Sequence, residues 1–405
     1  MKKLKVLWQQ SPNTSIYVGQ LAEVQRRIYF EYEPDFIESG IQLSPFKCPL
    51  QGGLIEHRDH AFGPLPGLFD DSLPDGWGLL LMDRHFRRLD VAPAAVSPIE
   101  RLSYLGLHTM GALTYHPPQD LEQDNQLLDL YALGKHAEAV YSGQTQEVLP
   151  QLERAGGSPG GARPKVLVGI KDNEVISGQD DLPDGFEAWI VKFASQQDVR
   201  NAGPLEYAYA LMAQAAEIRM PPVQLLEVAK HRHYFCIKRF DRGPGNRRIH
   251  MHTFGNLVHA NFRIPSTDYA DLFKVTQVLT RNHQDTLKLF RRMVFNIVSH
   301  NRDDHAKNFA FLMDEQGQWS LAPAYDLTFS PGPGGEHSMT LLGEGRIPTR
   351  IHCLKLAEQC GIKRESALSI IDHTNEVTQK WPEYAQQAGC SRRIIQQVKQ
   401  SLCLL

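Results

Sequence analysis

The 405-residue sequence lacks several features that would assign it to a class at once. Its six cysteines are scattered and form no C-x-x-C pair, which argues against a zinc site or a disulfide framework and fits a reducing cytosol. No apolar run is long enough to span a membrane, and the basic start has too short an apolar segment for a secretory signal. With a formal net charge of -3, no overall basic field directs the chain to nucleic acid. We therefore expect a cytoplasmic protein without a membrane partner.

The order of the elements predicts a β-containing half followed by a helical half. Three short strands are expected in "LKVLW", "SIYVGQLA" and "RRIYFEYE", and a helix in "DDSLPDGWGLLLMDRHFRRL" with Ser72 as its N-cap. A double proline and the acidic "QDLEQDNQ" indicate a boundary near residues 117–126. Further strands are expected in "KVLVGI", "FEAWIVKFA" and "HYFCIKRFDR", with a helix from Pro204, and helices dominate from Thr267 onward.

Two features of the middle of the chain are able to contact a phosphate. The glycine-rich loop "GGSPGGARPK", residues 156–165, surrounds Ser158 with four glycines, and glycines let backbone N–H groups approach phosphate oxygens. It is not a Walker A loop, and taken alone it is better explained as a flexible surface turn. Lys192 ends the apolar run "WIVK" and Glu206 follows on the next helix, an order that a Lys–Glu pair would require. The alternative is a lysine that extends to solvent.

The segment "HNRDDHAKNF", residues 300–309, holds the densest group of polar side chains. Asp303 and Asn308 have the spacing of the kinase catalytic loop, in which the carboxylate accepts a hydroxyl proton and the amide oxygen binds Mg²⁺. Asp304 competes with Asp303 for the role of base, and the spacing to Asn308 selects Asp303. Asp326, in "APAYDL", follows at the position of a second metal ligand. His305 could order the loop, because no H-E-x-x-H pattern indicates a zinc site.

Together, "SPGGARPK", "IVKF", "KRFDR", "NRDDHAKNF", "LAPAYDL" and "DSLPDGWG" resemble the HipA-type serine/threonine kinases, toxins of type II toxin–antitoxin modules. The resemblance runs along nearly the whole chain. It implies an α+β, protein-kinase-like two-lobed fold with a β-containing N-lobe, a mostly helical C-lobe and an added N-terminal β-rich subdomain. The implied divisions are residues 1–120 for the N-terminal subdomain, 121–240 for the N-lobe with the glycine-rich loop, and 241–405 for the C-lobe with the catalytic loop.

The resemblance also implies roles for individual residues. Asp303 would be the catalytic base and Lys192 would position the phosphates, while Asn308 and Asp326 would hold Mg²⁺ and Ser158 would be autophosphorylated. The implied ATP contacts are Gly160, Gly161, Ala162, Arg163, Pro164, Lys165, Lys192, Glu206, Lys238, Arg239, Phe240, His305, Ala306, Lys307, Asn308, Tyr325 and Asp326.

The implied activity is phosphorylation of a translation factor, such as an aminoacyl-tRNA synthetase, with ATP and Mg²⁺. The implied partner is a HipB-like helix-turn-helix antitoxin, through which DNA contact would be indirect. Arg163-Pro164 stands where better-known members carry Gln-Glu, and Asp304 where some have glycine, so the substrate stays open. Two alternatives are a small-molecule or lipid kinase, and a nucleotide-binding pseudokinase within a DNA-bound repressor complex.

The "LPDGWG" segment has a simpler interpretation. Trp77 and the leucines after it are expected to form the packed face of a helix, with Asp71 and Asp75 as charges at its positive end. This interpretation gives the segment a structural role only.

Overall fold

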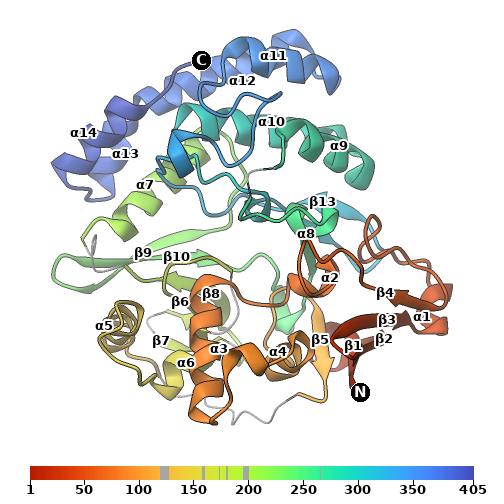
Figure 1. Cartoon of the computed structure of the whole chain (residues 1–405). Helices are drawn as coiled ribbons and strands as arrows, with labels where there is room; N and C mark the ends of the chain where they lie inside the picture. The colour runs from red at the N-terminus through yellow and green to blue at the C-terminus, as the bar shows by residue number, and fades with distance from the viewer. Residues whose placement is uncertain (119–126, 157–159, 173, 179–180, 195–199, 265) are drawn as a thin grey trace.

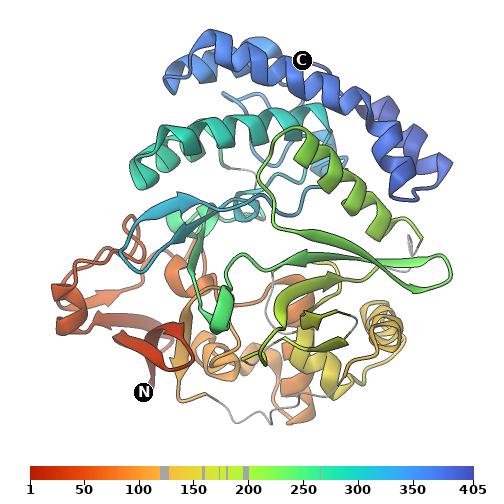
Figure 2. The ribbon, with the colours of Figure 1, turned by 180° about the vertical axis from the view of Figure 1, so that it is seen from behind.

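The computed structural model describes residues 1–118, 127–156, 160–172, 174–178, 181–194, 200–264 and 266–405. Ser158 therefore lies outside the described residues. Three regions follow one another along the chain: an N-terminal region (residues 1–118), a middle region (127–240) and a C-terminal region (241–405). Figures 1 and 2 show the N-terminal sheet and the middle sheet on one side of the molecule, with the long C-terminal helices on the opposite side.

The N-terminal region is built on an antiparallel sheet with the strand order β4-β3-β2-β1-β5. Its strands are β1 (Lys2–Ser11), β2 (Thr14–Val24), β3 (Arg27–Tyr32), β4 (Leu54–Glu56) and β5 (Leu113–His116). Its helices are α1 (Pro34–Glu38), α2 (Gly67–Asp70), α3 (Gly76–Arg88), η1 (Pro93–Ala95) and α4 (Pro98–Leu105). Alternate residues of β1 (Leu4, Val6 and Trp8) are buried, as the period of two along a strand requires. The three strands predicted here are confirmed.

The starts of two helices in this region differ in how they are capped. At α4, Ser97 and Glu100 form the capping box, because the Ser97 hydroxyl accepts from the Glu100 N–H and the Glu100 carboxylate from the Ser97 N–H. The N-cap prediction for Ser72 is wrong, because α3 begins only at Gly76. The Ser72 hydroxyl instead lies 2.8 Å from the Tyr115 hydroxyl inside the core.

The middle region carries a second antiparallel sheet, with the order β7-β6-β8-β10-β9. Its strands are β6 (Lys165–Lys171), β7 (Glu174–Ser177), β8 (Glu187–Lys192), β9 (Val223–Ala229) and β10 (Arg232–Lys238), and its helices are α5 (Leu130–Tyr141), α6 (Pro150–Gly156) and α7 (Ala202–Ala215). Trp189 and Val191 of β8 pack into a core with Trp77 and Leu81 of α3. The N-terminal region thus supplies a helix to the middle region (Figure 1). Lys192, one residue after Val191, lies on the other face of the sheet.

The C-terminal region combines a small sheet with long helices. The sheet has the order β11-β12-β13, from β11 (His250–Thr253), β12 (Ala310–Met313) and β13 (Trp319–Leu321). The helices are η3 (Pro244–Asn246), α8 (Phe254–Val258), α9 (Tyr269–Thr280), α10 (His283–Val298), η4 (Ala306–Asn308), η5 (Pro333–Gly335), α11 (Arg350–Gln359), α12 (Arg364–Gln379), α13 (Trp381–Gln387) and α14 (Arg392–Ser401). The hairpin β12–β13 and a mainly helical chain from α9 onward were predicted; η3, β11 and α8 were not. No helix in the described part of the chain is both long and apolar enough to cross a membrane.

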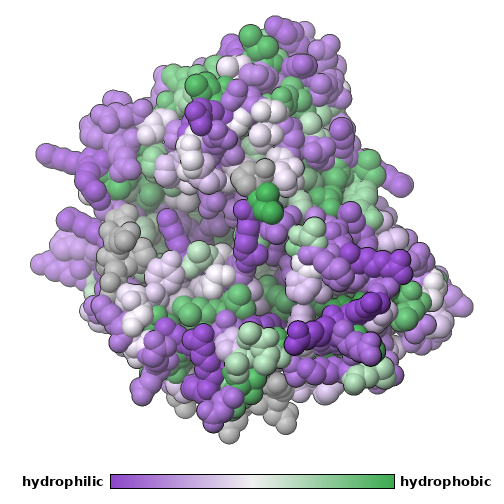
Figure 3. All heavy atoms as spheres, viewed as in Figure 1, coloured by the Kyte–Doolittle hydropathy of each residue, from purple (hydrophilic) through white to green (hydrophobic). Residues whose placement is uncertain are grey.

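The three regions share their cores and their buried charges. Met313 is buried in the hydrophobic core of the N-terminal region, and Trp319 packs against it. Asp241, which is 1% exposed, accepts from Arg239 Nη2 and Arg242 Nη1, each at 2.7 Å, and from the Gly111 N–H at 2.8 Å. Asp241 thus holds Arg239 and Arg242, two of the arginines in "KRFDRGPGNRR", inside the protein and away from any basic surface. The face drawn in Figure 3 is mostly hydrophilic, with hydrophobic side chains in small groups.

Candidate active site

The segment 300–309 lies between α10 and β12, and a buried arginine, Arg292, holds it by a hydrogen bond. Arg292 of α10 donates to the Asn308 carbonyl oxygen, and its guanidinium lies 4.3 Å from the centre of the Phe309 ring and 5.4 Å from that of Tyr325. Burial lowers the pKa of Arg292 to about 10, well above neutral pH, so the side chain stays charged. Arg292 is a site-organising residue that the sequence reasoning missed, because nothing in "LFRRMVF" separates it from an ordinary helix arginine.

The two adjacent carboxylates of this segment have different surroundings. Asp304 is buried, and its oxygens accept from the Tyr269 hydroxyl at 2.7 Å and the Ser338 N–H at 2.9 Å and lie 2.9 Å from His337 Nδ1. Asp303 is exposed as a whole residue, but protein atoms partly cover its carboxyl, and this partial burial, together with the nearby Asp326, raises the pKa of that carboxyl. The geometry leaves only Asp303 of the two able to meet a substrate, in agreement with the choice made from the spacing to Asn308.

Lys192 joins two acidic residues that follow it in the sequence, Glu206 and Asp326. Its Nζ lies 2.6 Å from Glu206 Oε2 on α7 and 2.5 Å from Asp326 Oδ1. Burial opposes the charge on Lys192, but Asp326 and Glu206 outweigh it and raise the pKa of Lys192. Lys192 in turn lowers the pKa of the Asp326 carboxyl, so both groups are ionised at neutral pH. The predicted Lys–Glu pair is therefore formed, and the alternative of a lysine extended to solvent is wrong.

A pocket lies where the three regions meet. Apolar side chains line one part of it, and Lys165, Lys192, Asn308 and Asp326 line another. The predicted site residues that line it are Gly160, Gly161, Lys165, Lys192, Lys238, Arg239, Phe240, His305, Lys307, Asn308, Tyr325 and Asp326. The lining residues that sequence reasoning did not select are Asp71, Leu73, Asp75, Met110, Ile190, Ile237, Asp241, Met251 and Thr253.

The remaining predicted residues lie beside or behind the pocket rather than in its described lining. Glu206 is 4% exposed behind Lys192, and its Oε1 lies 3.2 Å from an Arg163 guanidinium nitrogen. Pro164 and Ala306 are buried, and Ala162 is exposed. Ala306 packs in the core of the C-terminal region. Its methyl group therefore contacts the protein interior and does not line the pocket.

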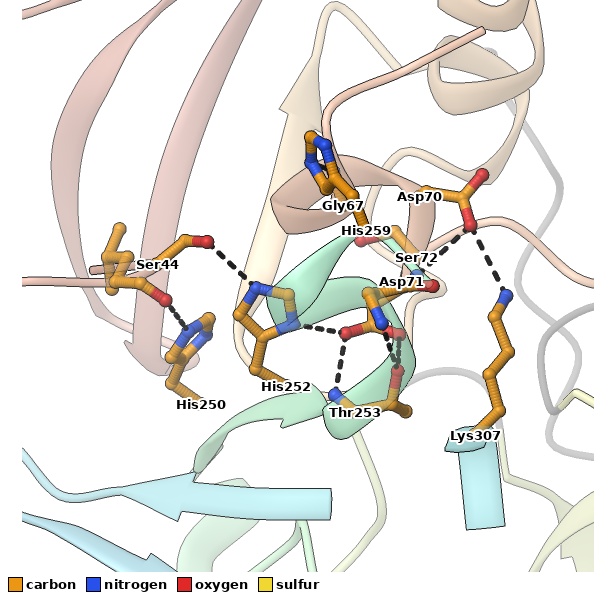
Figure 4. Close-up of polar contacts among 12 residues, drawn as sticks. Ser44, Gly67, Asp70, Asp71, Ser72, His250, His252, Thr253, His259 and Lys307 are labelled. Carbon is orange, nitrogen blue, oxygen red and sulfur yellow. Dashed lines mark hydrogen bonds and ion pairs between the residues drawn. The ribbon is translucent and has the colours of Figure 1, made fainter. Parts of the chain in front are cut away.

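Asp70 and Asp71 attach the N-terminal region to the C-terminal one, as Figure 4 shows. Asp71 Oδ2 accepts from the Thr253 N–H at 2.7 Å and lies 2.5 Å from His252 Nδ1, while its Oδ1 accepts from the Thr253 hydroxyl at 2.7 Å. Asp70 Oδ2 lies 3.2 Å from Lys307 Nζ, beside the pocket. The prediction that Asp71 is a charge at the start of a helix is therefore wrong.

The pocket contains the donors that a divalent cation with phosphate ligands would require. Asn308 Nδ2 donates to the Asp303 carbonyl oxygen at 2.7 Å, which leaves the amide oxygen as the acceptor atom of that side chain. Asp326 adds a carboxylate in the same pocket, held in a left-handed backbone conformation at φ 56°. One carboxylate and one amide oxygen suit Mg²⁺, which takes its other oxygens from phosphates and water. Across the described residues, the pocket included, no group of three or more His, Cys, Asp or Glu side chains could hold a metal ion.

Comparisons with known proteins agree with the fold. Residues 157–381 match the HipA-like C-terminal domain, and residues 11–116 match the HipA N-terminal domain. "Putative kinase Y4dM" of Sinorhizobium fredii is 30% identical over 155 residues, which cover 35% of this chain and 37% of that protein. "Putative kinase Y4mE" of the same organism is 33% identical over 129 residues, which cover 29% and 30%. The chain thus matches about a third of the length of these curated relatives.

A solved structure extends the likeness to the whole chain. The HipA of a Shewanella oneidensis MR-1 toxin–antitoxin system, solved with HipB and its operator DNA, superposes with a TM-score of 0.71 at 16% identity and covers 98% of this chain and 95% of that one. At this identity the match concerns the fold. The fold is therefore the mixed α/β HipA fold, and the expected fold class is confirmed. Since the C-terminal domain pattern covers more than half of the sequence, the chain belongs to the HipA family.

Proposed function

We propose that this protein is an ATP- and Mg²⁺-dependent serine/threonine protein kinase that acts as the toxin of a toxin–antitoxin module. The observation that supports it most is the placement of Lys192 between Glu206 and Asp326, in the same pocket as Asn308 and beside an exposed Asp303. Phosphoryl transfer needs charge stabilisation and positioning more than covalent chemistry, and these groups supply both. The two relatives with kinase names and the family membership support the same class of reaction.

Each residue has a defined part in this proposal. The Lys192 ammonium, which Glu206 holds in place, would donate to phosphate oxygens of ATP. Asn308 and Asp326 would hold Mg²⁺, which when bound neutralises charge on the transferred phosphoryl group. Asp303 would orient the acceptor hydroxyl and accept its proton. Because the pKa of Asp303 is raised and the base must be ionised, the rate should fall as the pH is lowered through that pKa.

The adenine would lie against the apolar part of the pocket, between Ile190 and Ile237 of the middle sheet and Tyr325 of the C-terminal region. The backbone N–H of Lys238 donates to the Pro222 carbonyl and that of Arg239 to the Ala188 carbonyl, both inside the protein. Of the "KRF" backbone, the Phe240 N–H would therefore be the donor to the base, and a carbonyl oxygen could accept from it.

Incubation with ATP and Mg²⁺ followed by intact-mass analysis and peptide mapping tests the proposal, with Asp303→Asn as the inactive control. We expect a phosphate on Ser158 in the wild type and none in the control. An aminoacyl-tRNA synthetase and a HipB-like antitoxin are the substrate class and partner to test next. If a wild-type protein that starts unmodified gains no phosphate and modifies no protein in an extract, a small-molecule acceptor or a nucleotide-binding role in a repressor complex replaces this proposal.

A further inference from the structure

The segment Asp75-Gly76-Trp77 of the N-terminal region contacts the glycine-rich loop directly. The Asp75 carboxylate accepts the Gly161 N–H, and the Trp77 N–H donates to the Gly161 carbonyl oxygen at 3.2 Å. Both polar groups of the Gly161 residue are therefore bonded to a segment that lies more than eighty residues earlier in the chain. The expectation that Asp75 is only a charge at the start of α3 is incomplete, because its side chain makes no cap hydrogen bond.

The same segment also holds the other end of the loop. The Trp77 indole Nε1–H donates to the Lys165 carbonyl oxygen at 2.9 Å, where the loop enters β6. Lys165 Nζ in turn donates to the Gly160 carbonyl oxygen. The described part of the loop is therefore held both by the N-terminal region and by its own lysine. Trp77 is 1% exposed and packs among the core residues of the middle sheet, which gives the contact a rigid support.

The backbones approach too closely for any side chain at position 76. Gly76 has φ +44°, and a Cβ built there would lie 2.6 Å from Ala162 Cα and 2.7 Å from the Gly161 carbonyl oxygen. These are backbone atoms, so an alanine could fit only if the loop or α3 moved. Glycine at this position therefore lets the start of α3 lie flat against the loop.

From these contacts we propose that Asp75, Gly76 and Trp77, here named the DGW clamp, are positioning residues that set the place of the glycine-rich loop for nucleotide phosphates. The inference rests on the proposed function, because Gly160, Gly161, Lys165 and Asp75 line the pocket in which ATP would bind. The Gly161 N–H and carbonyl oxygen are already bonded to the clamp, so the clamp acts by fixing the backbone from Gly160 to Lys165 before the phosphates arrive. The N-terminal region is thus part of the nucleotide site.

The test compares two glycine-to-alanine variants that carry similar backbone strain. Gly76→Ala adds a methyl group against the loop, whereas Gly40→Ala, at φ +68°, adds one in a place with nothing within 4 Å. Neither changes the charge of the pocket, which an Asp75 variant would do. We expect Gly76→Ala to weaken the binding of Mg·ATP, measured by calorimetry, by roughly ten- to a hundredfold. KM for ATP should rise more than kcat falls, and Gly40→Ala should bind like the wild type.

Trp77→Phe provides a second route if Gly76→Ala does not fold. The phenylalanine keeps an aromatic ring but loses the Nε1–H that holds Lys165, so weaker Mg·ATP binding is again expected, to a smaller degree. The clamp is overturned, and the proposed function left intact, if folded Gly76→Ala binds Mg·ATP as tightly as the wild type. If Gly76→Ala does not fold, the same result with folded Trp77→Phe overturns the clamp. A wild-type protein that binds no Mg·ATP overturns the proposed function instead.

Discussion

Two acidic segments, one at residues 70–75 and one at residues 303–304, each use their carboxylates in two ways. In each, one carboxylate is enclosed by hydrogen bonds: Asp71 by His252 and Thr253, and Asp304 by Tyr269 and Ser338. A second carboxylate in each lies at or beside the pocket, as Asp75 and Asp303 do. Asp71 and Asp304 thus serve the fold through the donors around them, whereas Asp75 bonds to the Gly161 N–H at the pocket and Asp303 is exposed.

The largest effect on activity is expected from the exposed member of the second segment. Asp303→Asn should lower the rate of phosphoryl transfer by roughly 10²–10⁴-fold, because the variant cannot accept the hydroxyl proton. Its melting temperature should stay close to that of the wild type, since Asp303 is exposed. Transfer of labelled phosphate from ATP and a thermal melt measure the two quantities. A variant that retains its rate would show that another group is the base.

Substitution of the buried neighbour, Asp304, should lower the stability of the protein. Asp304→Ala removes the acceptor of the Tyr269 hydroxyl and the Ser338 N–H and leaves both donors buried, which should lower the free energy of unfolding by about 3 kcal/mol. Asp271→Ala, which changes an exposed acid on α9, is the matched control and should stay within about 0.5 kcal/mol of the wild type. Urea denaturation distinguishes them, and equal midpoints would contradict the structural role of Asp304.

In the first segment, the loss of unfolding free energy on substitution should be smaller than for Asp304→Ala. Asp71→Asn keeps one acceptor oxygen, so we expect about 1–2 kcal/mol of destabilisation, chiefly from the weakened contacts with His252 and Thr253. Because these contacts join the N-terminal and C-terminal regions, limited proteolysis should cut the variant faster than the wild type. Unchanged digestion together with an unchanged urea midpoint would show that the regions are held by their shared core alone.

The most gradual effect is expected from acid at the same junction. Burial lowers the pKa of His250 and that of His259 to about 4, from an unfolded value near 6.5. Their folded pKa values are depressed, so their contribution to stability is complete above about pH 6.5 and is lost as the pH falls toward 4. The urea midpoint should decline through this range. His259→Asn, which loses the bond to the Gly67 N–H at 2.9 Å, should be less stable at pH 7.5 and decline less steeply.

The sequence predicted the parts of this protein that depend on local patterns. Short strand-like runs between turn residues predicted β1 to β3, and the spacing from Asp303 to Asn308 favoured the carboxylate that the burial of Asp304 leaves accessible. Contacts between distant segments could not be read in this way. The DGW clamp looks like an ordinary helix start, and only the fold brings Gly76 against the glycine-rich loop.

Other misses have the same origin. The four-residue β11 is a strand because it pairs with β12, sixty residues later, and its own pattern is too short to predict one. Arg292 has its role because α10 passes under the Asn308 carbonyl. The ATP and Mg²⁺ contacts, the phosphorylation of Ser158 and the partners remain predictions.

The buried Met313 has a consequence for the order in which the protein is made. The core of the N-terminal region, whose last strand ends at His116, is complete only when Met313 and Trp319 pack into it. A ribosome adds roughly 5–20 residues per second, so the first sheet waits on the order of ten to forty seconds for the hairpin that covers it. During that time the apolar side chains that Met313 and Trp319 will cover stay exposed to solvent. A polypeptide that ends before the hairpin lacks this part of the core.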